Sequence, residues 1–175
     1  MTENMNTMLC GLPMSGKTTV GKILAQQLNF HFVDIDQLIE KAYAAKMGKT
    51  LSCRQIFLQE GERIFREVEK QQIVSLIGAE KTVISLGGGS LTDQSNINTL
   101  QLIGPLIYLK VSTNILWKRM QMYGIPPYLD SADPEKAFYV LAEKRTPLYE
   151  KLSDTIIEAD LLNAQEIITS ILKKV

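Results

Sequence analysis

The stretch GLPMSGKTT, residues 11–19, follows the short apolar run TMLC and precedes a segment with helical periodicity. It matches the pattern G-x-x-x-x-G-K-[ST], in which a glycine-rich turn between a strand and a helix presents backbone N–H groups to phosphate. The helix dipole favours the bound anion, the lysine reaches the β- and γ-phosphates, and the hydroxyl that follows it binds Mg²⁺. The sequence therefore predicts a triphosphate site formed by Gly11, Met14, Ser15, Gly16, Lys17, Thr18 and Thr19.

The whole chain has the composition of one globular domain. Of its 175 residues, 45% are hydrophobic and 22% are charged, and a chain of this length buries a core without disulfides. Basic and acidic residues number 19 each, which argues against a broad nucleic-acid-binding surface. Two cysteines form no disulfide framework, and no leader or long apolar run is apparent. We expect a single domain, 1–175, that is cytoplasmic and monomeric, with no nucleic-acid or membrane partner.

Short apolar runs alternate with amphipathic segments along the chain. Strands are expected at 7–10, 30–35, 82–86, 105–111 and 154–159. After the helix that the phosphate loop opens, further helices are expected at 36–46, 53–77 (in two pieces), 93–102, 113–123, 134–146 and 163–174. Strands separated by helices form right-handed βαβ units and a parallel sheet covered on both faces. The pattern predicts a three-layer α/β/α fold with a five-stranded parallel sheet, of the P-loop NTPase type.

Two aspartates at the end of the second strand favour a kinase over other nucleotide-binding classes. The chain has neither the N-K-x-D signature of a GTPase nor the apolar strand ending in Asp-Glu of a motor ATPase. In FVDID, Asp34 and Asp36 alternate with apolar residues, which places both carboxylates on one side of a strand. They fall at its carboxyl end, where open α/β sheets bind ligands. We expect Asp34 to lie near Mg²⁺ and Asp36 near an acceptor hydroxyl; alternatively, Asp36 caps the next helix.

Three successive glycines and three arginines are the other candidate site residues. Gly87, Gly88 and Gly89 follow the strand TVISL, and they either let backbone approach a ligand or form a tight turn. Arg145 shares a helix face with apolar residues, so it needs a partner, either a bound anion or a structural carboxylate. We expect Pro147 to end that helix. Arg66 has Glu62 and Lys70 four residues to either side, a spacing that favours a solvated face.

Arg119 precedes the segment YGIPPYLDSADP, 123–134, which contains three prolines and reads as a mobile flap or a surface connection. Its side chain either reaches the nucleotide or is solvated.

Together these stretches resemble the shikimate kinase family, small P-loop phosphotransferases of the nucleoside-monophosphate-kinase-like group. The resemblance rests on GLPMSGKTTVGK, DID, IFLQEGERIFREVE, SLGGG and EKRTPLYEKLSD, which follow in this order over nearly the whole chain. Only the segment between Asp36 and Ile56 is several residues longer than the family pattern. The resemblance implies transfer of the γ-phosphoryl group of ATP to the 3-hydroxyl of shikimate, with Mg²⁺ as cofactor, in aromatic amino-acid synthesis by way of chorismate.

The resemblance also implies a role for each candidate residue. Lys17 and the loop hold the phosphates, and Thr18 and Asp34 bind the metal. Asp36 binds shikimate hydroxyls and is a candidate base, so Lys17 and Asp36 are the expected catalytic residues. Arg66 and Arg145 clamp the shikimate carboxylate, which a planar guanidinium suits well, and Gly87, Gly88 and Gly89 contact the ring. This supersedes the solvated interpretation of Arg66. The resemblance also implies a shikimate-binding segment at about 36–66 and a lid at about 123–134.

The chain departs from the family pattern in two places. The family's lid usually carries Arg-Pro-Leu-Leu, whose arginine reaches the transferring phosphoryl group; here the corresponding residues are Pro126, Pro127, Tyr128 and Leu129. The stretch EADLLNAQE, 158–166, lacks the basic residue often found beside the adenine.

Two alternatives remain open. One is a kinase for another small hydroxylated acceptor, such as gluconate or a nucleoside monophosphate. The other is a nucleotide-binding regulatory homologue that has lost catalysis. Asp36, Arg66 and Arg145 together favour a compact hydroxylated carboxylate as the acceptor.

Overall fold

Five parallel strands form the centre of the molecule, whose computed structural model describes residues 5–129 and 132–174. The strands are β1 (Thr7–Cys10), β2 (His31–Asp34), β3 (Thr82–Ser85), β4 (Leu106–Lys110) and β5 (Thr155–Glu158). Their order in the sheet is β2-β3-β1-β4-β5. All five predicted strands are therefore present, each slightly shorter than or equal to its predicted range.

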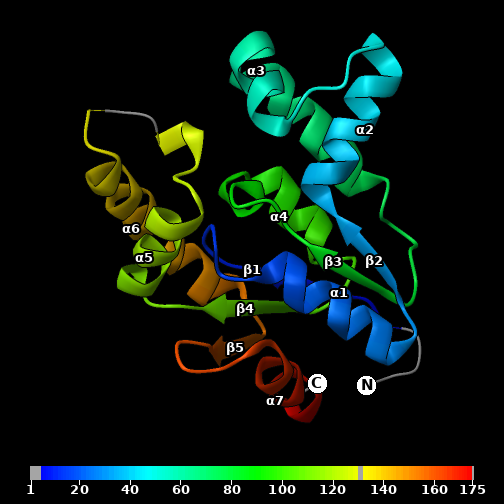
Figure 1. Ribbon diagram of the computed structural model, residues 1–175. Coiled ribbons are helices and arrows are strands. Elements are labelled where there is room, and N and C mark those ends of the chain that lie inside the picture. The colour runs from blue at the N-terminus through cyan, green and yellow to red at the C-terminus, as the bar shows by residue number, and fades with distance from the viewer. Residues whose placement is uncertain (1–4, 130–131, 175) are drawn as a thin grey trace.

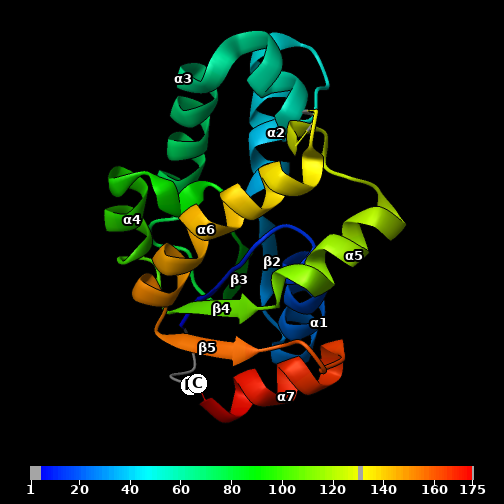
Figure 2. The ribbon, with the colours of Figure 1, turned by 90° about the vertical axis from the view of Figure 1, so that its left-hand side faces the viewer.

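Helices cover both faces of this sheet, which confirms the predicted three-layer α/β/α fold. On one face, α1 (Lys17–Leu28) packs against α7 (Ala164–Lys174). On the other face lie α4 (Gln94–Leu100), α5 (Thr113–Tyr123) and α6 (Pro134–Leu152), with α6 in contact with β4 (Figures 1 and 2). A hairpin of α2 (Ile35–Met47) and α3 (Cys53–Val74) extends beyond the strand that leads into it (Figure 1). Two short 3₁₀ helices, η1 (Ser90–Thr92) and η2 (Pro127–Leu129), complete the described elements.

The apolar strands are buried because helices lie on both sides of them. Met8, Leu9 and Cys10 of β1 are buried, as expected for a central parallel strand with no solvent-facing side. The helix that follows packs closely on the sheet at Gly21, where a β-carbon would lie 2.6 Å from the Phe32 ring. This close packing fixes the start of α1 relative to the ends of β1 and β2.

The strand order brings three loops together at the carboxyl edge of the sheet. β3 lies between β2 and β1, and the pairing aligns Asp34 with Ser85 and Ser85 with Leu9. The N–H of Leu86 also donates to the Leu9 carbonyl at 3.0 Å. After β1 the chain crosses toward β2, whereas after β3 it crosses toward β4, so the two loops diverge at a topological switch point. Ligands of open α/β sheets bind at such a point.

Two sequence predictions about helices have different outcomes. The predicted break in the long helix is confirmed, because Gly61 interrupts α3 with a φ of 82°. The predicted end at Pro147 is wrong, since α6 continues through Pro147 to Leu152. A proline inside a helix removes one hydrogen bond and is costly, but Tyr149 just beyond it is buried in the core and favours continuation of the helix.

Within the described ranges, none of the helices has both the length and the apolar character that a membrane span requires.

Candidate active site

The phosphate loop joins β1 to α1 and leaves the amino end of α1 open to a ligand. Gly16 caps the helix with a left-handed φ of 92° and provides no side-chain acceptor for the first-turn N–H groups. The Nζ atom of Lys17 donates to the carbonyls of Gly11, at 2.9 Å, and Leu12, at 3.1 Å. Burial lowers the pKa of Lys17, although nearby Asp36 and Asp34 partly oppose this effect. The loop therefore presents N–H donors and one cation on the same side.

Arg119 lies against this loop, so it is not a freely solvated side chain. Its Nη1 atom donates to the Met14 carbonyl at 3.0 Å, across more than a hundred residues of sequence. Met14 itself has a left-handed φ of 64°, which turns the loop backbone at that point. The predicted nucleotide residues thus lie together, with α5 supplying the arginine.

Thr18 and Asp34 form an oxygen-rich pair beside the loop. The Thr18 hydroxyl donates to Asp34 Oδ2 at 2.8 Å, and Asp34 Oδ1 accepts from the Asp36 N–H at 3.1 Å, which caps α2. Hydroxyl and carboxylate oxygens suit Mg²⁺, which prefers a few protein oxygens together with phosphate oxygens and water. In the described ranges, no group of three His, Cys, Asp or Glu residues could hold a metal ion. These two residues therefore fit a magnesium ion that is held mainly by a bound nucleotide.

Asp36 does not lie on the strand as its spacing predicted. β2 ends at Asp34 and α2 begins at Ile35, so the alternation prediction is wrong and Asp36 occupies the first helical turn. The helix cap is Asp34, so the alternative of Asp36 as the cap is also wrong. The structural reason is that Asp34 itself satisfies the Asp36 N–H and starts the helix one residue earlier. Asp36 nevertheless stays at the carboxyl edge of the sheet.

The surroundings of Asp36 make its carboxylate basic. The pKa of Asp36 is raised to about 6: desolvation by the surrounding protein is the largest cause, the charge of Asp34 adds to it, and Lys17 opposes both. Glu69 and Glu40 also raise the pKa, by smaller amounts. Such a carboxylate is a better proton acceptor near neutral pH than an ordinary aspartate.

Each glycine of the triplet that follows β3 faces one of the predicted substrate residues. A β-carbon on Gly87 would lie 2.8 Å from Asp36 Oδ1, one on Gly88 would lie 2.9 Å from Arg145 Nη1, and one on Gly89 would lie 2.8 Å from Arg66 Nη1. All three distances are shorter than real β-carbon contacts. The triplet is therefore a close-approach surface. It brings Asp36, Arg66 and Arg145 around one short backbone segment.

The two arginines differ in their partners. Arg66 is only partly exposed, and its Nη1 forms a 2.7 Å ion pair with Glu69 Oε2; its Nε also lies 3.8 Å from Glu62. The solvated interpretation of Arg66 is therefore wrong. Arg145, by contrast, forms no ion pair with any carboxylate of the described residues, so the structural-carboxylate alternative receives no support there. Because an unpaired guanidinium in a partly buried position favours an anion, Arg145 is available to bind one.

The sequence interpretation missed two residues that organise this site. Glu69 is buried, and besides Arg66 it accepts a 2.9 Å hydrogen bond from the Ser90 hydroxyl. Tyr149 donates from its hydroxyl to the Gly88 carbonyl at 2.7 Å. The signals were present as helical spacings of three residues from Arg66 to Glu69 and four from Arg145 to Tyr149.

Of the predicted lid, 123–134, the structure describes residues 123–129 and 132–134, and residues 130 and 131 lie outside the described residues. Leu129 is buried, whereas Tyr128 is 54% exposed. The hydroxyl of Tyr128 nonetheless lies among protein groups. Its pKa is raised to about 12, mainly by desolvation, with Arg145 opposing the rise and Asp36 adding to it. The segment predicted to be a lid thus carries a neutral phenol toward Arg145 and Asp36, and Pro126 contributes no charge.

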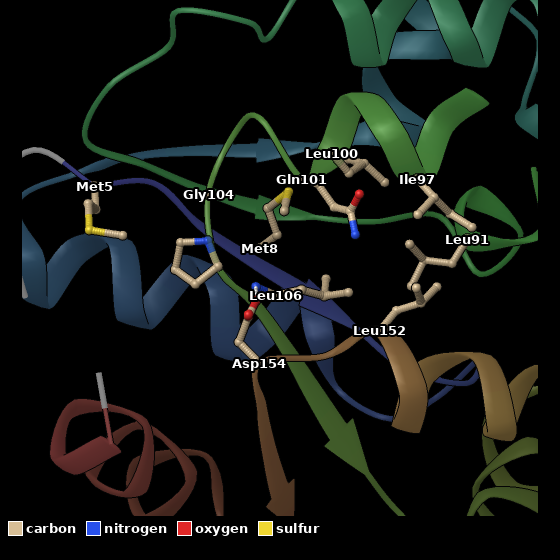
Figure 3. A pocket seen from close by; sticks show the side chains of 11 residues that line it. Met5, Met8, Leu91, Ile97, Leu100, Gln101, Gly104, Leu106, Leu152 and Asp154 are labelled. Carbon is tan, nitrogen blue, oxygen red and sulfur yellow. Dashed lines mark hydrogen bonds between the residues drawn. The ribbon is translucent and has the colours of Figure 1, made fainter. Parts of the chain in front are cut away.

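A cavity of about 360 Å³ lies at the opposite edge of the sheet (Figure 3). Its lining includes Met5, Gly104 and Asp154, which precede β1, β4 and β5, and apolar residues of η1, α4 and α6 such as Leu91, Ile97 and Leu152. Since Met5, Gly104 and Asp154 lie at the amino ends of the strands and no residue of the phosphate loop lines the cavity, it is separate from the cluster around that loop.

Comparisons with known proteins place this chain among similar sequences and structures. A family model described as "Shikimate kinase" matches residues 13–175. A shikimate kinase from a Sulfurihydrogenibium species is 38% identical over 170 residues, which cover 97% of each chain. One from Thermodesulfovibrio yellowstonii is 34% identical over 169 residues, covering 97% of this chain and 94% of the relative. Among solved structures, a shikimate kinase from Acinetobacter baumannii in complex with shikimate has a TM-score of 0.85 and 31% identity, and the match covers 96% of this chain and 90% of that one.

Proposed function

The chain belongs to the shikimate kinase family, and from this membership we propose that it transfers the γ-phosphoryl group of ATP to the 3-hydroxyl of shikimate, giving shikimate 3-phosphate and ADP. The observation that carries this proposal is the contact of Gly87, Gly88 and Gly89 with Asp36, Arg145 and Arg66, respectively. One carboxylate and two guanidinium groups around a side-chain-free surface suit a small ring that bears hydroxyls and a carboxylate.

The arginines bind the acceptor's carboxylate. Arg145 supplies a guanidinium that forms no ion pair with the described residues, and Arg66 keeps its position because Glu69 holds it at 2.7 Å. A guanidinium and a carboxylate form two parallel hydrogen bonds, which fixes both the distance and the orientation of the ring. Gly88 and Gly89 leave the space that these side chains occupy beside the loop.

Asp36 faces the acceptor's hydroxyl group. Its pKa of about 6 lets the carboxylate accept a hydrogen bond from the attacking hydroxyl, and a proton as the new phosphate ester forms. Because phosphoryl transfer depends mostly on positioning and on neutralising charge, orienting the hydroxyl is the larger part of this role.

The phosphate loop and its neighbours hold the nucleotide. The N–H groups at the start of α1 and the ammonium group of Lys17 neutralise the β- and γ-phosphates, and Arg119 keeps the loop in place through Met14. Thr18 and Asp34 would hold Mg²⁺ through their oxygens. When bound, the metal neutralises charge on the phosphate oxygens. With Pro126 in the lid segment, Lys17 and the metal are left to neutralise the charge on the transferring group.

The residues proposed above complete the site within one copy of the chain, and we propose that the enzyme is monomeric. Both cysteines are free, which supports a reducing compartment such as the cytoplasm.

A coupled assay of ADP release tests the proposal against its alternatives. Purified protein is given Mg-ATP with shikimate, gluconate or a nucleoside monophosphate as the acceptor. We expect release that depends on shikimate and far exceeds that with the other acceptors. Faster turnover of gluconate or of the nucleotide would assign another acceptor, and nucleotide binding without release on any acceptor would assign a regulatory homologue.

A further inference from the structure

The glycine triplet is fixed in two different ways. The Gly87 and Gly89 carbonyls accept hydrogen bonds from the N–H groups of Ser90 and Thr92, at 3.1 and 3.0 Å, so their ties are local. The Gly88 carbonyl is instead held from another element, since it accepts the 2.7 Å hydrogen bond of the Tyr149 hydroxyl from α6. A run of three glycines is the most flexible backbone that a chain can contain, so an external tie matters there.

The helix α6 touches Gly88 with two side chains. Arg145 and Tyr149 lie one helical turn apart, and therefore on the same face. Arg145 Nη1 lies 2.9 Å from the position where a Gly88 β-carbon would be, and Tyr149 holds the carbonyl of the same residue. The helix α6 therefore both carries Arg145 and, through Tyr149, sets the distance between Arg145 and the Gly88 peptide.

The Tyr149 side chain is itself rigid. Only 2% of the residue is exposed, and its ring packs on Tyr108 with centroids 5.2 Å apart. Burial raises the pKa of Tyr149 well above its usual range, so the hydroxyl stays protonated and acts as a donor at neutral pH. A phenylalanine would fill the same space but leave the Gly88 carbonyl without this donor.

We propose that Tyr149 is a positioning residue of the acceptor site: its hydroxyl holds Gly88 in the orientation that lets Arg145 present its guanidinium to the acceptor's carboxylate. This inference rests on the proposed function, because it takes shikimate as the acceptor. Tyr149 touches neither the nucleotide loop nor the reacting atoms in this scheme. Its loss is therefore expected to affect acceptor binding and to spare nucleotide binding.

The test is a calorimetric titration of Tyr149→Phe with shikimate and, separately, with Mg-ADP. We expect the shikimate Kd to rise about 5- to 20-fold, as for loss of one buried hydrogen bond, with the Mg-ADP Kd unchanged within twofold. The methyl ester of shikimate, which lacks the negative carboxylate, should bind the wild type and the variant nearly equally. A merely structural role would weaken all three ligands together, and that result would contradict the proposal.

Tyr139→Phe is the matched control, since it removes a tyrosine hydroxyl from the same helix. That hydroxyl donates to Asn114 on α5 at 2.9 Å and does not reach the glycine triplet. We expect wild-type affinity for shikimate in this variant. If Tyr149→Phe is unstable alone, titration in saturating Mg-ADP favours the folded state by mass action. Equal shikimate affinity in Tyr149→Phe and wild type overturns the inference, whereas a wild type that does not bind shikimate overturns the proposed function instead.

Discussion

Arg145 lies so close to Gly88 that a β-carbon on the glycine would be 2.9 Å from the Nη1 atom. Gly88 has no left-handed φ, so an alanine there is disfavoured by this contact and not by backbone strain. We expect Gly88→Ala to displace the guanidinium and weaken shikimate binding by about tenfold, the effect of one impaired charge-assisted hydrogen bond. Titration calorimetry measures this directly. In an Arg145→Ala background the same change should add little, because coupled sites are not additive; full additivity would contradict the contact.

Removal of Arg145 should weaken the acceptor's binding more strongly. Arg145→Ala deletes a guanidinium that has no ion pair among the described residues, so only the ligand loses a partner. We expect a roughly 10- to 100-fold rise in the shikimate Kd, with nucleotide affinity retained. Lys144→Ala, at the exposed neighbouring position, is the control and should bind as the wild type does. Equal shikimate affinity in Arg145→Ala would refute the clamp.

The lid position Pro126 allows a gain-of-function prediction. Pro126→Arg would add a cation to a lid that carries no arginine at this place, and such groups stabilise charge in phosphoryl-transfer transition states. We expect kcat to rise severalfold with little change in the shikimate KM, as measured by steady-state kinetics. Pro126→Gln removes the proline ring without adding charge and should not raise kcat. An unchanged or lower kcat in Pro126→Arg would contradict the prediction, because it would show that an added positive charge at this position does not help catalysis.

The raised pKa of Asp36 predicts a pH dependence of acceptor binding. In metal-free buffer, the carboxylate is protonated below about pH 6 and ionised above it, so its capacity to accept a shikimate hydroxyl rises with pH through this value. We expect the shikimate affinity to increase as pH rises from 5 to 7 and then to level off. Binding titrations at several pH values with a chelator present measure this.

Glu40→Gln tests the electrostatic cause. Glu40 is one of the negative charges, with Asp34 and Glu69, that raise the pKa of Asp36, and Lys17 lowers it. Glutamine keeps an oxygen for the Cys53 N–H that Glu40 now binds at 2.9 Å. The midpoint of the affinity profile should therefore move to lower pH. A midpoint that stays in place or moves upward would contradict this assignment.

Local patterns predicted most of the framework, and long-range packing accounts for the errors. The phosphate loop, the five strands and the break in α3 follow from short-range signals such as glycine positions and apolar runs. Pro147 misled the interpretation because the burial of Tyr149, which favours a continued helix, depends on a strand and a loop that lie far away in the sequence. Asp36 was misplaced because the sequence shows the same alternation of polar and apolar residues whether the strand ends at Asp34 or continues beyond it.

The candidate site was predictable as a set of residues but not as an arrangement. Spacing on one helix indicated a solvated Arg66, since nothing local reveals that Glu69 is buried. Which glycine faces which charged side chain depends on the register of β1, β2 and β3 and on the path of α6 across the sheet. The hydrogen bond from Tyr149 to Gly88 could not be predicted from the sequence either, because it joins residues 61 positions apart.

The central claim is that this chain phosphorylates the 3-hydroxyl of shikimate, and the most direct measurement is identification of the product. Protein, Mg-ATP and shikimate are incubated together, and the mixture is analysed by phosphorus and proton NMR. We predict equimolar ADP and a single phosphate ester, coupled to the proton at carbon 3, with Arg145→Ala forming it much more slowly at low shikimate concentration. Release of inorganic phosphate without an ester, or an ester at another hydroxyl, would contradict the claim.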